Sequence, residues 1–195
     1  MTVIAIRAPL TFAALIALAS SQHGPEGHLR LPKSGVTERV PHDHLRSSQD
    51  AVAWLRARRE FSAPRAAPSA ADLATLREIR AALRDLARGR VGAYERGTEL
   101  LLRGTAFELQ REGALAAVGA GWPRFAAAFL PALVAIERER TRLKRCANER
   151  CGWLFLDRSA ARTRRWCDMN ACGNRVKARR FRARARRTRR ATAHT

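Results

Sequence analysis

The four cysteines of the chain all lie in one short segment, where they form two matched pairs. Cys146 and Cys151 make the first pair, Cys167 and Cys172 make the second, and four residues separate the members of each pair. Two tight turns that each carry two thiolates can fill the tetrahedral shell of a structural Zn²⁺ ion, leaving no open position for catalysis. The spacing therefore predicts one structural zinc ion held by these four residues.

The residues beside the cysteines fit a metal centre. Gly152 and Gly173 each follow the second cysteine of a pair. Glycine adopts positive φ without steric cost, so we expect both to turn backbone N–H groups toward the sulfurs. Four thiolates around a divalent ion carry net negative charge, which nearby cations would offset. The candidates for that role are Lys144, Arg145, Arg150 and Arg165.

Other chemistries also use four cysteines. Two disulfides would need an oxidising compartment, and an iron–sulfur cluster would need four thiolates. Residues 8–19 are apolar and end in Ala17-Leu18-Ala19, which resembles the cleavage site of a signal peptide. The segment is too short to span a bilayer. We expect a buried helix there, in a cytoplasmic protein with zinc. An exported cationic protein with disulfides is the alternative.

Residues 1–140 are expected to form a mainly helical domain that contains no recognisable catalytic pair, phosphate loop or nucleophile motif. Apolar residues at steps of three and four predict a helix over 72–88, capped by Ser69 or Asp72 and ended by Gly89. The other expected elements are a short helix over 50–61, a helix over 93–103, a hairpin within 105–118 around Glu112-Gly113, and one long helix over 122–144 that is kinked at Pro131 and leads into Cys146.

Two groups of polar residues in this domain are expected to be exposed to solvent. The segment 22–49 is rich in Gly, Pro and His, which predicts a long solvated loop. Its histidines are His23, His28, His42 and His44. The arginines of the helix over 72–88 are expected to lie mostly on its solvated face. They are Arg77, Arg80, Arg84 and Arg88.

The charge of the chain indicates a polyanionic partner. The formal net charge is +21, and residues 141–195 hold 18 basic against 3 acidic residues, a net +15. After Cys172 the chain predicts a basic helix, which an apolar stripe of Ala178, Phe181 and Ala185 would seat against the metal module. Between the cysteine pairs, Trp153, Phe155 and Trp166 are expected to form a miniature core, within a short hairpin.

The segment 143–187 resembles the CGNR zinc finger family. The matching residues are Cys146, Cys151, Phe155, Asp157, Ser159, Arg164-Arg165-Trp166-Cys167, Met169, Cys172-Gly173-Asn174-Arg175 and Lys177. The resemblance implies zinc ligation by the four cysteines and binding to DNA. Residues 8–140 weakly resemble the ABATE domain that precedes this finger in the family, a stress-responsive regulatory domain, although its N-terminal apolar segment ending in Asn-Thr is not apparent here.

These observations predict a mainly α fold in three parts: a helical domain at 8–140, a zinc finger at 143–187 made of a β-hairpin and a basic helix, and a disordered basic tail at 188–195. We expect a DNA-binding transcriptional regulator that is not an enzyme and has no membrane partner. The sequence leaves open whether the protein forms a homodimer. An RNA- or protein-binding zinc module is the alternative. The expected nucleic-acid contacts are Arg164, Arg165, Asn174, Arg175, Lys177, Arg179, Arg180 and Arg182.

Overall fold

The computed structural model describes residues 11–26, 42–103, 105–111 and 115–192, which are mainly helical with three two-stranded antiparallel sheets. The elements up to residue 102 are α1 (Phe12–Ala19), β1 (Gln22–His23), β2 (His42–Asp43), α2 (Ser48–Arg56), α3 (Ala70–Leu86) and α4 (Ala93–Leu102). Those that follow are β3 (Phe107–Leu109), β4 (Leu115–Ala117), α5 (Gly121–Ala127), α6 (Leu130–Arg138), η2 (Arg140–Arg142), β5 (Leu143–Arg145), β6 (Leu154–Leu156), η3 (Met169–Gly173) and α7 (Asn174–Thr192).

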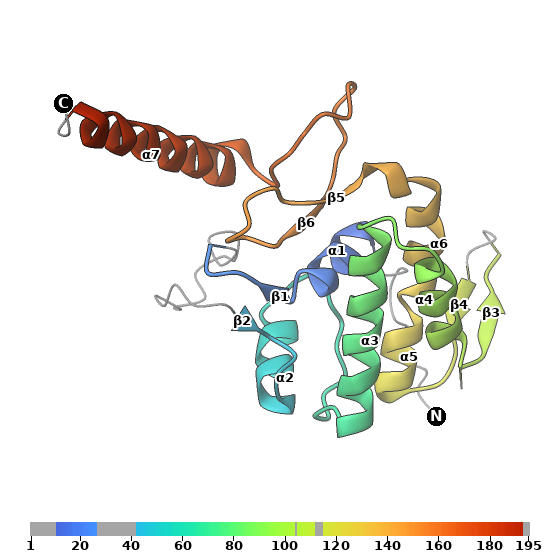
Figure 1. Cartoon of the computed structure of the whole chain (residues 1–195). Coiled ribbons are helices and arrows are strands. Elements are labelled where there is room, and N and C mark those ends of the chain that lie inside the picture. The colour runs from blue at the N-terminus through green and yellow to red at the C-terminus, as the bar shows by residue number, and fades with distance from the viewer. Residues whose placement is uncertain (1–10, 27–41, 104, 112–114, 193–195) are drawn as a thin grey trace.

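Helix α3 forms the centre of the helical body and packs against α1, α2, α4 and α5 (Figure 1). It begins with a capping box, in which the Ser69 hydroxyl accepts from the Asp72 N–H and the Asp72 carboxylate accepts from the Ser69 N–H. Gly89, just beyond the helix, has a φ of 70°. The predicted apolar face is buried, and it consists of Leu73, Leu76, Ile79, Leu83 and Leu86. The sequence prediction for this helix is confirmed.

Helix α1 lies in the core. The Thr11 side chain caps its N-terminus, and Ala14, Leu15 and Leu18 are almost fully buried against α3 and α6. The prediction of a buried helix is confirmed for residues 12–19, while residues 8–10 lie outside the described part of the chain. Within the described residues, no helix combines the length and the apolar character needed to cross a membrane.

The stretch that was expected to be one long helix over 122–144 consists of two helices, a 3-10 turn and a strand. Helix α5 ends at Ala127, and α6 begins at Leu130 with Pro131 in its first turn. Proline fits that position because the N–H it lacks would have no partner inside the helix. The chain then passes through η2 and reaches Cys146 as strand β5, so the predicted helical approach to the cysteines is wrong.

The prediction of a solvated loop over 22–49 is also wrong for its described residues. Gln22–His23 pairs with His42–Asp43 as β1 and β2. His23 and His44 are 3% and 7% exposed, with their Nε2 atoms 3.2 Å apart, and His44 stacks on Trp54. Two buried imidazoles thus close the space between α2 and this sheet. His28 lies outside the described residues.

Three of the four arginines assigned to the solvated face of α3 instead bind this small sheet and the chain after it. Arg80 is buried and forms a two-pronged ion pair with Asp43, at 2.5 and 3.0 Å. Arg77 donates to the Leu45 and Arg46 carbonyls. Arg84 donates to the Gln22 carbonyl, and burial together with the charge of Arg80 lowers the pKa of Arg84 to about 10. Only Arg88 is exposed as expected.

The remaining predicted elements of the body are present. Helix α2 buries Trp54 and Leu55, and α4 covers most of the expected helix at 93–103. Strands β3 and β4 form the hairpin expected within 105–118, with Phe107 opposite Ala117. Its expected turn at Glu112-Gly113 falls outside the described residues.

Candidate metal centre and basic helix

Strands β5 and β6 form the base of the cysteine segment. Leu143 lies opposite Leu156 and Arg145 opposite Leu154, so the hairpin encloses the first cysteine turn. The Cys146 N–H extends the pairing by donating to the Trp153 carbonyl at 2.8 Å. The sequence had placed this hairpin between the two cysteine pairs, which is wrong. The reason is that Leu143, which precedes the first cysteine pair, joins the core of the helical body together with Leu154, and a hairpin within residues 153–166 would not include Leu143.

The four cysteines converge on one point. All are buried, and their Sγ atoms lie within 4.8 Å of one another. The Cys151–Cys167 and Cys167–Cys172 sulfur separations are 3.8 and 3.7 Å. Zinc–sulfur bonds of about 2.3 Å at tetrahedral angles place sulfurs about 3.8 Å apart. Disulfide-bonded sulfurs would lie about 2.05 Å apart, and all four cysteines are free. The cluster can hold one zinc ion.

The pKa shifts of the thiols suit the binding of a cation. A hydrogen bond from the Cys151 thiol lowers the pKa of Cys146 to about 2. The same interaction with Cys146 raises the pKa of Cys151 far above its usual range, and interaction with Cys146 raises that of Cys167 to about 12. Ionisation is thus favoured at Cys146 and disfavoured at Cys151 and Cys167, where a further negative charge would lie in a buried site. A divalent cation removes that obstacle, which suits a metal centre.

The two glycines have different roles. Gly152 has a φ of +71°, as predicted, and backbone N–H groups of Asn148 and Trp153 donate to the sulfurs of Cys146 and Cys151. Gly173 does not adopt positive φ, so the prediction for it is wrong. It belongs to the π-helical turn η3, where a Cβ atom would meet the Met169 sulfur at 2.5 Å. Gly173 thus provides room for Met169 beside Cys172.

A buried carboxylate, Asp157, organises the chain between the cysteine pairs. Its Oδ2 accepts from Lys144 Nζ at 2.7 Å and from the Arg164 N–H, and its Oδ1 accepts from the Ser159 N–H and hydroxyl. These hydrogen bonds, the one from Lys144 above all, hold the pKa of Asp157 well below its ordinary range. In the sequence, Asp157 stands out only as part of the family pattern. Lys144 pairs with Asp157 instead of lying free to offset the metal charge.

The aromatic residues form the predicted miniature core beside the sulfurs. Trp153 and Phe155 are buried with the four cysteines, and Trp166 packs against them partly exposed. The Arg164 guanidinium covers the Phe155 ring at 5.2 Å, and its Nε donates to the Trp166 carbonyl. Arg165 lies over the Trp166 ring at 5.5 Å. Both arginines help to close this core, although their side chains remain solvent-accessible.

A short segment from the other end of the chain, residues 22–26, crosses the first cysteine turn; we call it the strap. The Gly24 N–H donates to the Cys151 carbonyl and the Glu26 N–H to the Arg150 carbonyl, both at 2.8 Å. A Cβ at residue 24 would overlap the Arg150 carbonyl, so glycine is required for this approach. No local sequence pattern marks the strap, because its partners are more than 120 residues away along the chain.

The strap also fixes the start of α7 through Glu26. Arg179 Nη1 and Asn148 Nδ2 donate to the Glu26 carboxylate at 2.6 and 2.7 Å, and Arg179 Nη2 donates to Asn148 Oδ1 at 2.6 Å. Arg150 lies 3.5 Å from the same carboxylate. Burial acts to raise the pKa of Glu26, but the hydrogen bonds from Arg179 and Asn148 outweigh burial and lower it overall. We call this group of four residues the Glu26 latch.

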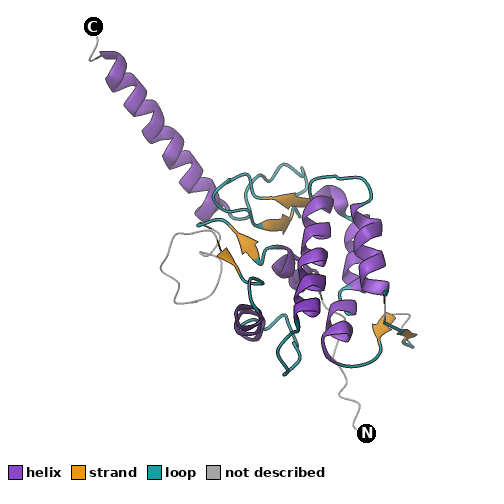
Figure 2. Ribbon diagram, turned by 60° about the horizontal axis from the view of Figure 1, so that its bottom comes forward, coloured by secondary structure: helices purple, strands orange, loops and turns teal. Residues whose placement is uncertain are grey.

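Helix α7 stands away from the rest of the protein (Figure 2), and every residue from 180 to 189 is exposed. Phe181 is 74% exposed, so the predicted seating of Ala178, Phe181 and Ala185 on the metal module is wrong: the helix leaves the module at an angle that puts the stripe in solvent. Helix α7 continues to Thr192, into the segment expected to be a disordered tail, and residues 193–195 are outside the described part.

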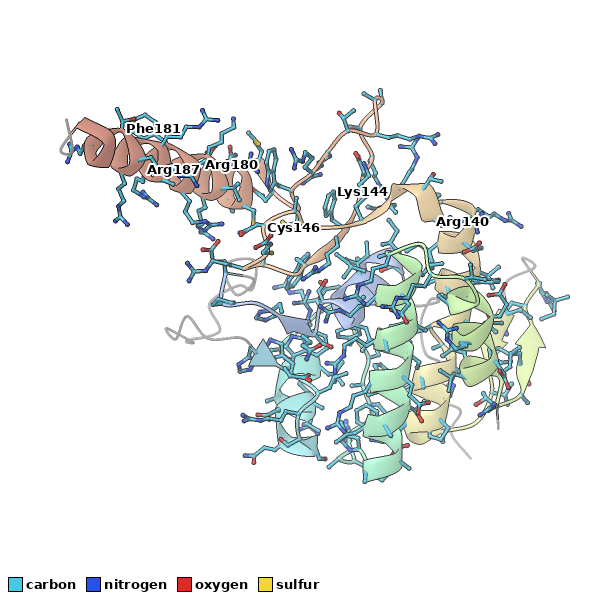
Figure 3. All side chains as sticks on the ribbon, in the orientation of Figure 1. Arg140, Lys144, Cys146, Arg180, Phe181 and Arg187 are labelled. Carbon is cyan, nitrogen blue, oxygen red and sulfur yellow. The ribbon has the colours of Figure 1, made fainter. Side chains whose placement is uncertain are left out.

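The predicted nucleic-acid contacts fall into two groups. Arg164 and Arg179 are committed to contacts within the protein, as described above. Arg175 is half-buried near the metal centre, and its Nη1 has no hydrogen-bond partner among the described residues. The others are exposed, namely Arg165, Asn174, Lys177, Arg180 and Arg182, and Figure 3 shows Arg180 on the freestanding part of α7.

The segment that holds the metal centre and the start of α7 is similar to a known family. Residues 142–185 match the model of the CGNR zinc finger family. This range contains all four cysteines, the β5–β6 hairpin, Asp157 and the first two-thirds of α7. No curated protein matches the chain. The CGNR match and the sulfur geometry agree on a zinc-binding segment at the same four residues.

Proposed function

We propose that this protein is a zinc-dependent DNA-binding regulator, in which the CGNR finger anchors α7 and α7 contacts duplex DNA. The observation that carries the proposal is the composition and exposure of α7. The helix has ten basic and no acidic residues among nineteen, is about 28 Å long, and is exposed at every residue from 180 to 189. Like charges on neighbouring turns destabilise a free helix, so a polyanion that neutralises them would stabilise it.

The rest of the chain supports a binding role rather than catalysis. Four thiolates would fill the coordination shell of zinc, which is the arrangement of structural sites. The free thiols suit a reducing compartment, and the proposal places the protein in the cytoplasm. The helical body, which resembles the ABATE domain weakly in sequence, would supply the response to stress or a contact with a second copy.

The experiment is a titration of fluorescently labelled duplex DNA of random sequence over a range of salt concentrations. About five to eight phosphate contacts predict a log–log slope near −5 to −7. Replacing four exposed basic residues of α7 by alanine should flatten the slope by about 3 to 4. The four are Lys177, Arg182, Arg184 and Arg189.

The matched control removes the same charge from exposed arginines of the body. These are Arg59, Arg65, Arg111 and Arg138. It should leave the slope within about one unit of that of the unchanged protein. Equal effects of the two sets would mean that α7 has no special role, and a flat salt response of the unchanged protein would refute DNA binding by charge neutralisation.

A further inference from the structure

The basic residues of α7 surround the helix on all sides but one. With about 100° of rotation per residue, they leave a single sector of roughly 120° free of charge. This sector, which we call the neutral stripe, carries Asn174, Ala178, Phe181, Ala185 and Thr188. Lys177 and Arg184 border it on one side, and Arg182 and Arg189 border it on the other.

The Glu26 latch determines where the neutral stripe points. Arg179 is the residue of α7 that binds Glu26 and Asn148, so its side of the helix faces the strap and the first cysteine turn. The centre of the stripe lies roughly 140° around the helix from Arg179. Asn174, Phe181 and Ala185 are exposed, and Figure 3 shows Phe181 on the part of α7 that stands clear of the body.

Phe181 is 74% exposed and lies near the centre of the neutral stripe, between two borders of basic residues. Single exposed apolar side chains are common on protein surfaces, so this position between the two basic borders carries the argument. Phe181 has no place in the core of the protein, and the flanking arginines leave it accessible. The partner that buries it must therefore also accept rows of positive charge on both sides. Duplex DNA fits this requirement, because its major groove has apolar thymine methyl groups on the floor and phosphates along both edges.

We propose that the neutral stripe is the face of α7 that enters the major groove, and that Phe181 contacts thymine methyl groups and sets sequence preference. The short side chains of Ala178 and Ala185 let the helix axis approach the bases. Asn174 can donate to and accept from an adenine edge. Arg182, Arg184 and Arg189 reach outward to the phosphates of the two strands. This assignment rests on the proposed function, since it names the surface that would carry it.

The test begins with selection of bound sequences from a pool of random duplexes by the full-length zinc-loaded protein. The selected duplex is then prepared with uracil in place of single thymines, which removes only the C5 methyl group. Loss of the contacted methyl should weaken binding of the unchanged protein about threefold to fivefold. Phe181→Ala should bind the thymine duplex about tenfold more weakly, yet show no further loss with uracil.

Leu109→Ala is the matched control, because Leu109 is 73% exposed on β3, outside the finger. It should respond to uracil as the unchanged protein does. The salt slope separates this proposal from the function on which it rests, because Phe181 carries no charge and Phe181→Ala should keep the slope. If the salt slope is steep but uracil weakens the unchanged protein and Phe181→Ala equally, the assignment of Phe181 is overturned while DNA binding stands. The same conclusion follows if the slope is steep and no sequence preference is selected.

Two further outcomes complete the test. Equal affinity for duplex RNA would overturn insertion into the major groove, because that groove is deep and narrow in A-form helices and does not admit a helix. Absence of any salt-dependent binding would overturn the proposed function and this assignment together. Circular dichroism of Phe181→Ala should match the unchanged protein, since the exposed ring makes no contribution to the core.

Discussion

Replacing Glu26 by glutamine should lower the stability of the protein and leave the salt dependence of DNA binding unchanged. The Glu26 carboxylate is 11% exposed and accepts hydrogen bonds of 2.6 and 2.7 Å from Arg179 and Asn148. Charge-assisted hydrogen bonds contribute about 1.5–3 kcal/mol each, and glutamine keeps one acceptor oxygen while losing the charge. We expect the free energy of unfolding to fall by about 2 kcal/mol, which lowers the melting temperature of a chain of this size by about 4–8 °C.

The same substitution releases Arg179 from its ion pair. Arg179 is half-buried at the start of α7 and lies about 140° around the helix from the neutral stripe. Arg179 therefore faces away from DNA, and the log–log salt slope should change by less than about 0.9, the value of one phosphate contact. The assays are thermal unfolding followed by circular dichroism and the titration of random duplex DNA described above.

Glu149→Gln is the control for this experiment. Glu149 is an exposed glutamate in the same cysteine turn, next to Asn148, and its replacement removes the same charge. It should leave the melting temperature unchanged within about 1 °C. If Glu26→Gln is as stable as Glu149→Gln, the latch does not hold the finger to the body, and the reasoning from these distances is refuted.

Three other predictions concern the metal centre, the strap and acid. Cys167→Ser should release zinc, measured by elemental analysis, and abolish the tertiary signal of Trp153 and Trp166 while the helical body stays folded; full metal content would contradict this. Gly24→Ala should speed hydrogen exchange in the first cysteine turn, because its Cβ would overlap the Arg150 carbonyl; unchanged exchange would contradict the close approach. Glu26 ionises below its ordinary pKa of 4.5, so the unfolded chain binds more protons and stability should fall as the pH drops through the lowered pKa. Glu26→Gln should make the decline in melting temperature between pH 5 and 3 shallower, and an identical decline would argue against this source of acid sensitivity.

The features that could be predicted from the sequence depend on residues close together along the chain. The four zinc ligands lie within one segment, and their spacing alone brings two turns to one ion. Helix α3 carries its apolar face at regular steps and its own capping box, so no distant partner is needed to recognise it. The β3–β4 hairpin is likewise local, because its strands are neighbours in the sequence.

The features that escaped prediction depend on distant partners. The local sequence predicts that His23 is a polar loop residue, but its contact with His44 buries it. The local sequence likewise predicts that Arg80 is solvated, but Arg80 forms an ion pair with Asp43, which is 37 residues away along the chain. Glu26 and Arg179 are 153 residues apart, and no local pattern marks either of them. Phe181 was misplaced for another reason: its apolar character suggested a contact inside the protein, whereas α7 leaves the module before the ring can reach it.

The central claim is that one zinc ion joins the four cysteines, and X-ray absorption at the zinc edge of protein purified under reducing conditions tests it most directly. We predict one zinc per chain with four sulfur neighbours at about 2.3 Å. A shell that includes nitrogen or oxygen neighbours, or protein that lacks metal yet retains an ordered finger, would contradict the claim.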